Sequence, residues 1–423
     1  MNELLLHAIW KYQFFQKGNL QTAQGEAVNI LKQGNYNTDA GPDFLHARIQ
    51  IGETEWNGHV EIHVHSSDWN AHKHQENNAY QNVILHAVWE NNKDILRPDG
   101  TLLPVLEMKP IVNPQLLENY KGLAQNNSPV PCSSQLSSVA SVTRWSATEQ
   151  ALVQRLEKKS DKVLGLLKVL NDDWEETAFQ LLAQNFGLKI NAEPFHLVAQ
   201  SIPVKTIRKH LNNLLQTEAL LFGQAGMLSA TGDEYARTLK KEYEFLKHKY
   251  SLEQKANVLQ WKFLRLRPAN FPTIRMAQLA ALLQSAKSLW SSLMEINNFK
   301  EAEKLFAIET SPYWKEHYRF GKKSAAPVPA FGKDIRNNIL INTLTPLWAA
   351  YGRAKDEPMW MEKALMLLQH VPGEKNRITK LYEALDWKSK TAFDSQGLIE
   401  LHNEMCMQRK CLDCAIGIKI LGF

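Results

Sequence analysis

Apolar and polar residues alternate along much of the first 110 residues, as they do in strands with one buried face. A helical stripe comes first, because Leu5 and Ile9 recur four residues apart in "MNELLLHAIWKY". Alternation then favours strands at "FLHARIQI" (44–51) and "TEWNGHVEIHVH" (54–65), and the apolar centre of "AYQNVILHAVWE" (79–90) is typical of a strand buried on both faces. Shorter strands are predicted within "EAVNILKQG" (26–34) and "TLLPVLEMK" (101–109).

The pattern becomes helical near residue 142. Leucines recur at helical spacing after Ser146, a predicted N-cap with Glu149 three residues later. Between the two patterns, "NNSPVPCSSQLSSVAS" (126–141) is rich in serine and proline, as linkers are. These patterns predict an α+β protein: an α/β domain at residues 1–115, a linker at 116–141 that carries Cys132, and a larger all-α domain at 142–423.

Composition narrows the class of protein. No apolar run reaches the roughly 18–20 residues that a membrane-spanning helix needs, which argues against a membrane protein. The N-terminus has an acidic residue, Glu3, and polar breaks, so we expect no signal peptide and a cytoplasmic location. Residues 1–110 hold 8 Lys+Arg and 13 Asp+Glu within a chain of net charge +5, so the remainder is basic. This asymmetry is compatible with a metal site presented to a polyanion.

Four polar side chains occupy strand positions in and before the second alternating run. A two-residue turn at Gly52 and Glu53 would set Asp43 opposite Ile62 and diagonal to Glu61 and His63. Glu61, His63 and His65 then share one face of the strand. Two carboxylates this close repel each other unless a cation lies between them or one is protonated. The hairpin therefore predicts a divalent-metal site that includes Asp43, Glu61 and His65.

"GPD" before one strand and "VEIH" within the next resemble the motif of the PD-(D/E)XK nuclease superfamily. The resemblance implies a restriction-endonuclease-like α/β core with a central mixed sheet and the order α-β-β-β-α-β. It also implies that Asp43 and Glu61 hold Mg²⁺ or Mn²⁺ and that His63, at the usual lysine position, orients or deprotonates the attacking water. The implied activity is hydrolysis of phosphodiester bonds in DNA or RNA, with Asp43, Glu61 and His63 as catalytic residues.

The histidines allow a different reading. His63 and His65 form one His-X-His pair, and His72 and His74 form a second, with Asp68 between the pairs. Such pairs suit zinc, iron or manganese and would indicate a zinc or manganese hydrolase of another substrate class. Alternatively, His72 and His74 are exposed in a polar loop. A third hypothesis is a nuclease-like scaffold that binds nucleic acid without cutting it, which the missing lysine would explain.

The four cysteines are unevenly placed. Cys406, Cys411 and Cys414 form a C-x₄-C-x₂-C run, and Cys132 lies far away in the linker. Together they predict a zinc site or an iron–sulfur cluster, with His402 as an alternative to Cys132. The arrangement resembles iron–sulfur-stapled nucleases, in which one distant cysteine joins three near the C-terminus.

Basic and aromatic residues are interleaved in the helical part. Arginines can clamp phosphates and aromatic rings can stack on unpaired bases, so we expect a nucleic-acid partner. The candidate contacts are Lys262, Arg265, Arg267, Arg275, Lys333 and Arg336. As a whole, the chain also resembles an uncharacterised bacterial family through "GPDF", "GHVEIHVHSSDW", "RLRPANFP" and "CLDCAIG".

Overall fold

The computed structural model describes residues 1–229, 232–257, 260–286 and 288–422. The chain forms two compact units: a sheet unit made of Met1–Ala147 together with His402–Phe423, and a helical unit made of Thr148–Leu401. The sheet unit thus extends beyond the domain predicted at residues 1–115, and it includes the C-terminal cysteine segment that we had placed in the helical domain. Helix α4 (Ser141–Val169) begins in the sheet unit and continues in the helical unit.

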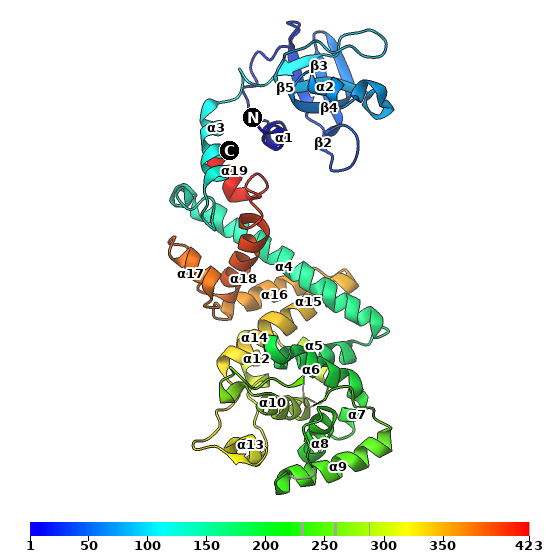
Figure 1. Cartoon of the computed structure of the whole chain (residues 1–423), viewed down its shortest axis with the longest axis vertical. Coiled ribbons are helices and arrows are strands. Elements are labelled where there is room, and N and C mark those ends of the chain that lie inside the picture. The colour runs from blue at the N-terminus through cyan, green and yellow to red at the C-terminus, as the bar shows by residue number, and fades with distance from the viewer. Residues whose placement is uncertain (230–231, 258–259, 287, 423) are drawn as a thin grey trace. The chain divides into compact units, whose positions relative to one another are not determined.

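A mixed six-stranded sheet is the centre of the sheet unit (Figure 1). Its strand order is β1-β3-β4-β5-β6, with β2 paired to β3. β3 pairs antiparallel with both β1 and β4, whereas β5 pairs parallel with both β4 and β6. The predicted α+β class is confirmed. The strands are β1 (Val28–Lys32), β2 (Asn35–Tyr36), β3 (Phe44–Ile51), β4 (Thr54–His65), β5 (Val83–Glu90) and β6 (Val105–Glu107).

The two faces of β4 have different chemistry. Val60 and Ile62 belong to an apolar core that includes Leu5 and Ile9 of α1 (Glu3–Tyr12). Glu61 and His63 alternate with them and are also buried. The parallel connection from β4 to β5 passes through α2 (Asp68–Ala71) and two short 3₁₀ turns, His74–Glu76 and Asn78–Tyr80. Because successive side chains of a strand point to opposite faces, β4 has an apolar face that packs on α1 and a polar face that holds Glu61 and His63.

A β-bulge in β3 changes the predicted register. Ile51 lies opposite Thr54 as expected, but Phe44 lies opposite Val60 and not Glu61, because β3 contains one extra residue between Phe44 and Ala47. His46 takes the left-handed conformation there, with φ of 58°, and its N–H donates to His59 Nδ1 at 3.3 Å. Asp43, the residue before β3, contacts both residues: its N–H donates to Glu61 Oε2, and its Oδ2 accepts from the N–H of Ile62.

Changing His46 to valine should destabilise the sheet unit. A left-handed backbone costs an ordinary L-residue about 1–2 kcal/mol, and a β-branched side chain adds to this cost. We expect His46→Val to lower the free energy of unfolding by about 1–2 kcal/mol, and His46→Gly to leave it equal or raise it. Urea unfolding monitored by fluorescence would measure this. Arg48→Val, on the same strand, is the matched control, and an equal loss in that variant would contradict the role of the bulge.

The remainder of the sheet unit consists of α3 (Pro114–Gln125), a 3₁₀ turn at Leu136–Ser138, a π-helical turn at His402–Cys406 and α19 (Ala415–Leu421). Asn119 on α3 donates to the carbonyl of Ile420 on α19 at 2.9 Å. The two helices therefore pair although they lie far apart in the sequence.

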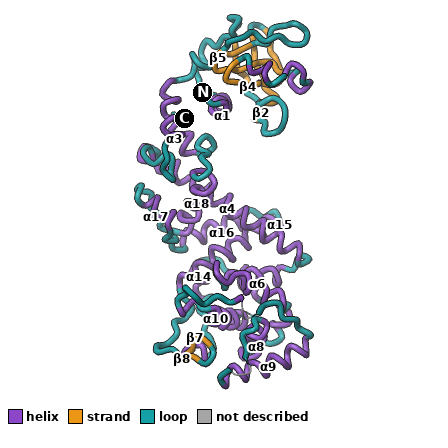
Figure 2. Tube along the Cα trace, viewed as in Figure 1, coloured by secondary structure: helices purple, strands orange, loops and turns teal. Residues whose placement is uncertain are grey.

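The helical unit has its own core, to which Phe179, Phe222, Leu282 and Trp348 contribute fully buried side chains. Figure 2 shows that helices dominate this unit, apart from the small hairpin of β7 (His317–Arg319) and β8 (Lys322–Lys323). Within the described residues, no helix is both long enough and apolar enough to cross a membrane. The helices after α4 are α5 (Trp174–Phe186), α6 (Leu188–Ser201), α7 (Val204–Arg208), α8 (Leu214–Gln224), α9 (Glu234–Tyr250), α10 (Pro272–Ser285), α11 (Leu289–Met294), α12 (Phe299–Leu305), α13 (Pro312–Glu316), α14 (Lys333–Ile339), α15 (Thr345–Lys355), α16 (Met359–His370), α17 (Arg377–Glu383) and α18 (Ala392–Leu401).

Candidate metal centre

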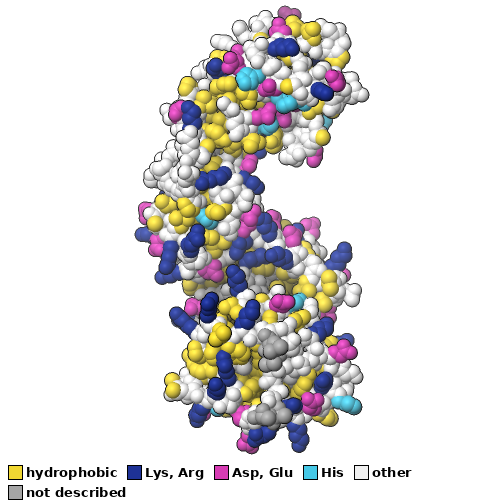
Figure 3. All heavy atoms as spheres, viewed as in Figure 1, with side chains coloured by type: hydrophobic (Ala, Val, Ile, Leu, Met, Phe, Trp, Pro, Cys, Tyr) yellow, Lys and Arg dark blue, Asp and Glu magenta, His cyan; other side chains and the backbone are white. Residues whose placement is uncertain are grey.

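Three histidines meet on the polar face of the sheet. His63 comes from β4, and His72 and His74 come from the connection that follows it. One ligand nitrogen of each lies within 4.8 Å of the others. Figure 3 shows histidine and acidic side chains adjoining one another on the visible face of this unit. The pair at 72 and 74 therefore joins His63 in one cluster, and within it His72 is exposed, as the loop alternative expected, whereas His74 is partly buried.

Glu61 adds a carboxylate to this histidine trio. Its Oε1 lies 3.5 Å from His63 Nε2 and 3.2 Å from His74 Nε2, and His63 Nε2 lies 3.1 Å from His72 Nδ1. A cation bound at about 2.0–2.1 Å in tetrahedral geometry separates its ligand atoms by roughly 3.3 Å. Three of these separations are close to that value, and the three histidine nitrogens lie within 4.8 Å of one another, so the histidine trio is arranged to hold a divalent metal ion with Glu61 beside it.

Aromatic contacts fix the two histidines of the connection. The ring of His74 stacks on Tyr80 with centroids 3.8 Å apart, and Trp69 meets it edge-on at 5.3 Å. His72 ends α2, and its N–H donates to the carbonyl of Asp68 at 2.9 Å. The segment between β4 and β5 therefore positions His72 and His74 although neither residue belongs to a strand.

His86 supports the trio from the neighbouring strand. It is fully buried on β5, beside Glu61 in the parallel register, and its Nε2 lies 2.8 Å from His63 Nδ1. Burial, then the charges of His63 and His74, hold its pKa well below the usual value, so the ring is neutral. A hydrogen bond to the far nitrogen fixes the orientation of a metal-binding imidazole. A histidine of the strand core thus contacts the trio through His63.

Glu61 and His63 are both held in their neutral forms when no cation is bound. Burial, followed by the charge of Asp43, raises the pKa of Glu61 to about 9. Burial and the neighbouring His74 and His72 lower the pKa of His63 to about 4. A neutral imidazole offers a lone pair to a metal, and a cation beside Glu61 would stabilise its ionised form. The electrostatics of the site therefore favour a bound cation.

Asp43 lies beside Glu61 at the edge of the trio. Its N–H donates to Glu61 Oε2 at 3.2 Å, and its Oδ2 accepts from the N–H of Ile62 at 2.9 Å and lies 3.4 Å from His7 Nε2. Burial opposes protonation of His7, but the hydrogen bond and charge of Asp43, with Glu3 and Glu61, raise its pKa overall. Sequence reasoning missed His7, because one histidine in an amphipathic helix carries no signal of its partners.

His65 does not join the trio. Its side chain is about half exposed, at 47%, and its Nδ1 faces Asp68 Oδ2 at 3.7 Å. The strand period places it on the face of Glu61 and His63, but β4 ends at His65 and the chain turns away. The histidines that lie next to His63 are His72 and His74, where we had expected His65.

The six basic candidates of the helical unit fall into two groups. Lys262, Arg265, Arg267 and Lys333 are exposed. Arg275 is only 4% exposed and donates to Gln278 and Asn270, so the expectation that it contacts a phosphate is corrected. Arg336 pairs with Glu303 at 2.8 Å and its side chain is 13% exposed, so it too belongs mainly to the packing of its helix.

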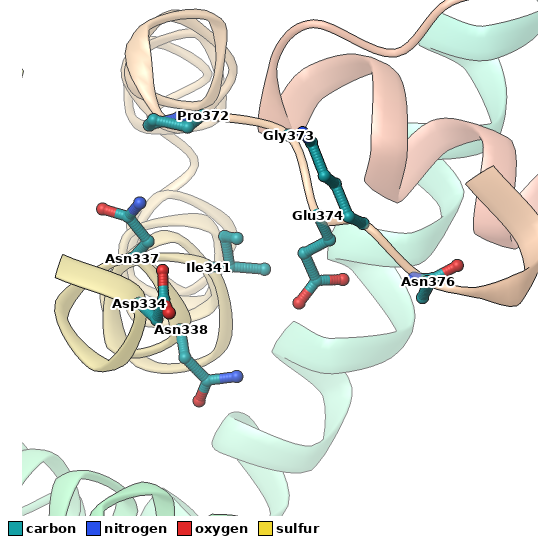
Figure 4. Close-up of a pocket in the computed structure, with 9 residues that line it drawn as sticks. Asp334, Asn337, Asn338, Ile341, Pro372, Gly373, Glu374 and Asn376 are labelled. Atoms are coloured by element: carbon teal, nitrogen blue, oxygen red, sulfur yellow. The ribbon is translucent and has the colours of Figure 1, made fainter. Parts of the chain in front are cut away.

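The helical unit also has a surface pocket of about 530 Å³ (Figure 4). Its lining has two carboxylates and one lysine, so it has no cationic wall for a polyanion. The lining residues are Asp334, Asn337, Asn338, Ile341, Pro372, Gly373, Glu374, Lys375 and Asn376.

The four cysteines all belong to the sheet unit, and none of them forms a disulfide. Cys132 and Cys406 are buried, whereas Cys411 and Cys414 are partly exposed. The structure therefore places the linker cysteine and the C-terminal run in the same compact body.

Comparison with known proteins gives one match. Neither the curated proteins nor the solved structures contain a match to this chain. A family model described as "Protein of unknown function (DUF2851)" matches residues 3–377, a range that includes the metal centre and Cys132 and ends before Cys406. Because this match covers most of the chain, the protein belongs to the DUF2851 family.

Proposed function

We propose that the sheet unit is a metal-dependent hydrolase of phosphodiester bonds in nucleic acid. The observation that carries the proposal is the convergence of His63, His72 and His74 within 4.8 Å of one another, with the Glu61 carboxylate 3.5 Å from His63 and 3.2 Å from His74. Three imidazoles and one carboxylate favour Mn²⁺ or Zn²⁺ over Mg²⁺, which prefers oxygen ligands. Mn²⁺ is a candidate metal both for the nuclease and for the alternative hydrolase that uses the histidines.

The order of elements supports phosphodiester hydrolysis. Apart from the two-residue strand β2 and two 3₁₀ turns, the elements from α1 to β5 run in the order α-β-β-β-α-β, with "GPD" before β3 and "VEIH" inside β4. This order agrees with the core that the resemblance to PD-(D/E)XK nucleases implies. His63 stands at the lysine position of that motif and is a member of the histidine trio. We infer that a metal ligand replaces the cationic lysine.

The residues at the edge of the centre suit the remaining steps. A bound divalent cation would act as a Lewis acid and lower the pKa of a water molecule. Asp43, oriented by Ile62 and His7, is placed to accept the proton that this water loses when its oxygen attacks phosphorus. His7 Nε2 lies 3.4 Å from Asp43 Oδ2 and is placed to orient this carboxylate.

A cleavage assay tests this proposal. Single- and double-stranded DNA and RNA would be incubated with wild type, Asp43→Asn and His65→Ala in Mn²⁺, Zn²⁺ or Mg²⁺. We expect Asp43→Asn to cut about 10²–10⁴-fold more slowly while binding metal within about threefold of wild type. His65→Ala, which removes a histidine outside the trio, should cut at the wild-type rate.

The other outcomes separate the alternatives. A wild type that binds metal and nucleic acid but cuts neither DNA nor RNA would support the binding-scaffold hypothesis. Hydrolysis of small ester substrates, without cleavage of nucleic acid, would support a hydrolase of another substrate class. Loss of metal binding in Asp43→Asn would show that Asp43 is a ligand and not the proton acceptor.

A further inference from the structure

The second group of metal-binding residues in the sheet unit consists of the four cysteines. Cys132 follows α3 in a turn, and Cys406, Cys411 and Cys414 flank two turns of the C-terminal segment. All four belong to the sheet unit, although most of the chain lies between Cys132 and the others.

Polar contacts hold the two segments together independently of any metal. The guanidinium of Arg409 donates to the carbonyl of Asn126, and Asn126 in turn donates to the carbonyl of Pro131, next to Cys132, at 2.7 Å. The pairing of Asn119 with Ile420 anchors the other end of the C-terminal segment. Leu412, between Cys411 and Cys414, packs on the core of the sheet. These contacts place the three C-terminal cysteines opposite Cys132.

The backbone around Cys414 is arranged for a charged sulfur. The N–H groups of Gly417 and Ile416 donate to the Cys414 thiol, and hydrogen bonds of this kind stabilise metal-bound thiolates. A Cβ at Gly417 would lie 2.1 Å from the carbonyl oxygen of Cys411, so only glycine allows this close approach. Arg409 adds a positive charge beside Cys411. Burial alone would oppose four thiolates, and these groups partly offset that cost.

No three of the four described cysteine sulfurs lie as close together as a single zinc ion would require. Four thiolates on one zinc ion, at about 2.3 Å each, lie roughly 3.8 Å apart. Within the described residues, the histidine trio meets the criterion of mutual distances under 4.8 Å, whereas no three of the cysteines do. A cubane cluster holds its four thiolates farther apart, because each binds a different iron. We propose that Cys132, Cys406, Cys411 and Cys414 ligate one [4Fe–4S] cluster, which joins the C-terminal segment to the turn after α3.

Metal analysis of the full chain tests this proposal without any variant. Protein purified anaerobically should contain about four iron and four sulfide per chain and show broad visible absorbance that dithionite bleaches. Zinc in place of iron, or no metal after anaerobic reconstitution with iron and sulfide, would overturn the proposal.

Variants then assign the ligands. Cys132→Ala and Cys411→Ala should each lose most of the iron, and Ser133→Ala, beside Cys132 in the same turn, should keep it. Because a lost cluster can also reflect an unfolded unit, binding of Mn²⁺ at the histidine trio serves as the check that each variant has folded. A Cys132→Ala protein that retains the full cluster would exclude this residue as a ligand. The cluster does not depend on the proposed hydrolase activity.

Discussion

Replacing His72 with alanine is expected to weaken binding of Mn²⁺ or Zn²⁺ by at least about 100-fold, with little change in stability. Even residues that only orient a metal ligand typically contribute 10–100-fold to affinity, so a direct ligand should contribute more. His72 is exposed, so its removal opens no cavity in the core. Titration calorimetry, or competition with a fluorescent chelator, would measure the affinity.

His65→Ala is the matched control for this experiment. It removes the same type of side chain from the end of β4, two residues beyond His63, but from outside the trio. We expect its affinity to stay within about threefold of wild type. If His72→Ala binds as tightly as His65→Ala, the trio is not the metal site.

Changing Glu61 to glutamine should have opposite effects on the metal-free and metal-bound forms. The pKa of Glu61 is raised from its usual 4.5 to about 9 in the folded, metal-free protein. Between these two values the folded state binds more protons than the unfolded state, so the contribution of Glu61 to stability falls as pH rises. Glutamine is neutral at every pH and removes this dependence, but it also removes a negative ligand for the cation.

The measurement is urea unfolding in the presence of a chelator between pH 7 and pH 9, above the range in which His63 titrates. The stability of Glu61→Gln relative to wild type should increase with pH by up to about 1.4 kcal/mol per pH unit. Groups such as Lys159, whose pKa is lowered to about 7 by burial, titrate alike in both proteins and cancel in the difference. Glu53→Gln, in the exposed turn before β4, should track wild type. A pH-independent difference would contradict the raised pKa.

The strands were predictable because their periodicity is local. Alternation located β3 and β4, and the glycine of "IGET" fixed the turn, so the pairing of Ile51 with Thr54 was predicted correctly. The bulge at His46 was not predictable, since a histidine in the left-handed region has no distinctive sequence signal. The face of the strand that holds Glu61 and His63 was nevertheless right, because the bulge lies in the partner strand.

The connection between β4 and β5 limited the prediction of the centre. His72 and His74 lie in a polar stretch without periodicity, where sequence spacing gives no direction to the side chains. Their His-X-His spacing was the only available signal, and it did not distinguish a ligand pair from an exposed loop. His65 was favoured over them because the strand period gave it a direction. Membership of the C-terminal segment in the sheet unit depends on contacts such as Asn119 with Ile420, which no local pattern reports.

The interrupted sheet unit has a consequence for how the protein is made. Residues Met1–Ala147 leave the ribosome first, but their partner segment, His402–Phe423, follows only after all of Thr148–Leu401 has been translated. At typical elongation rates of about 5–20 residues per second, this delay is on the order of tens of seconds. During that interval the surface of α3 that binds α19 is uncovered, and the helical unit can complete its own core. Synthesis from the N-terminus therefore favours folding of the helical unit before the sheet unit is complete.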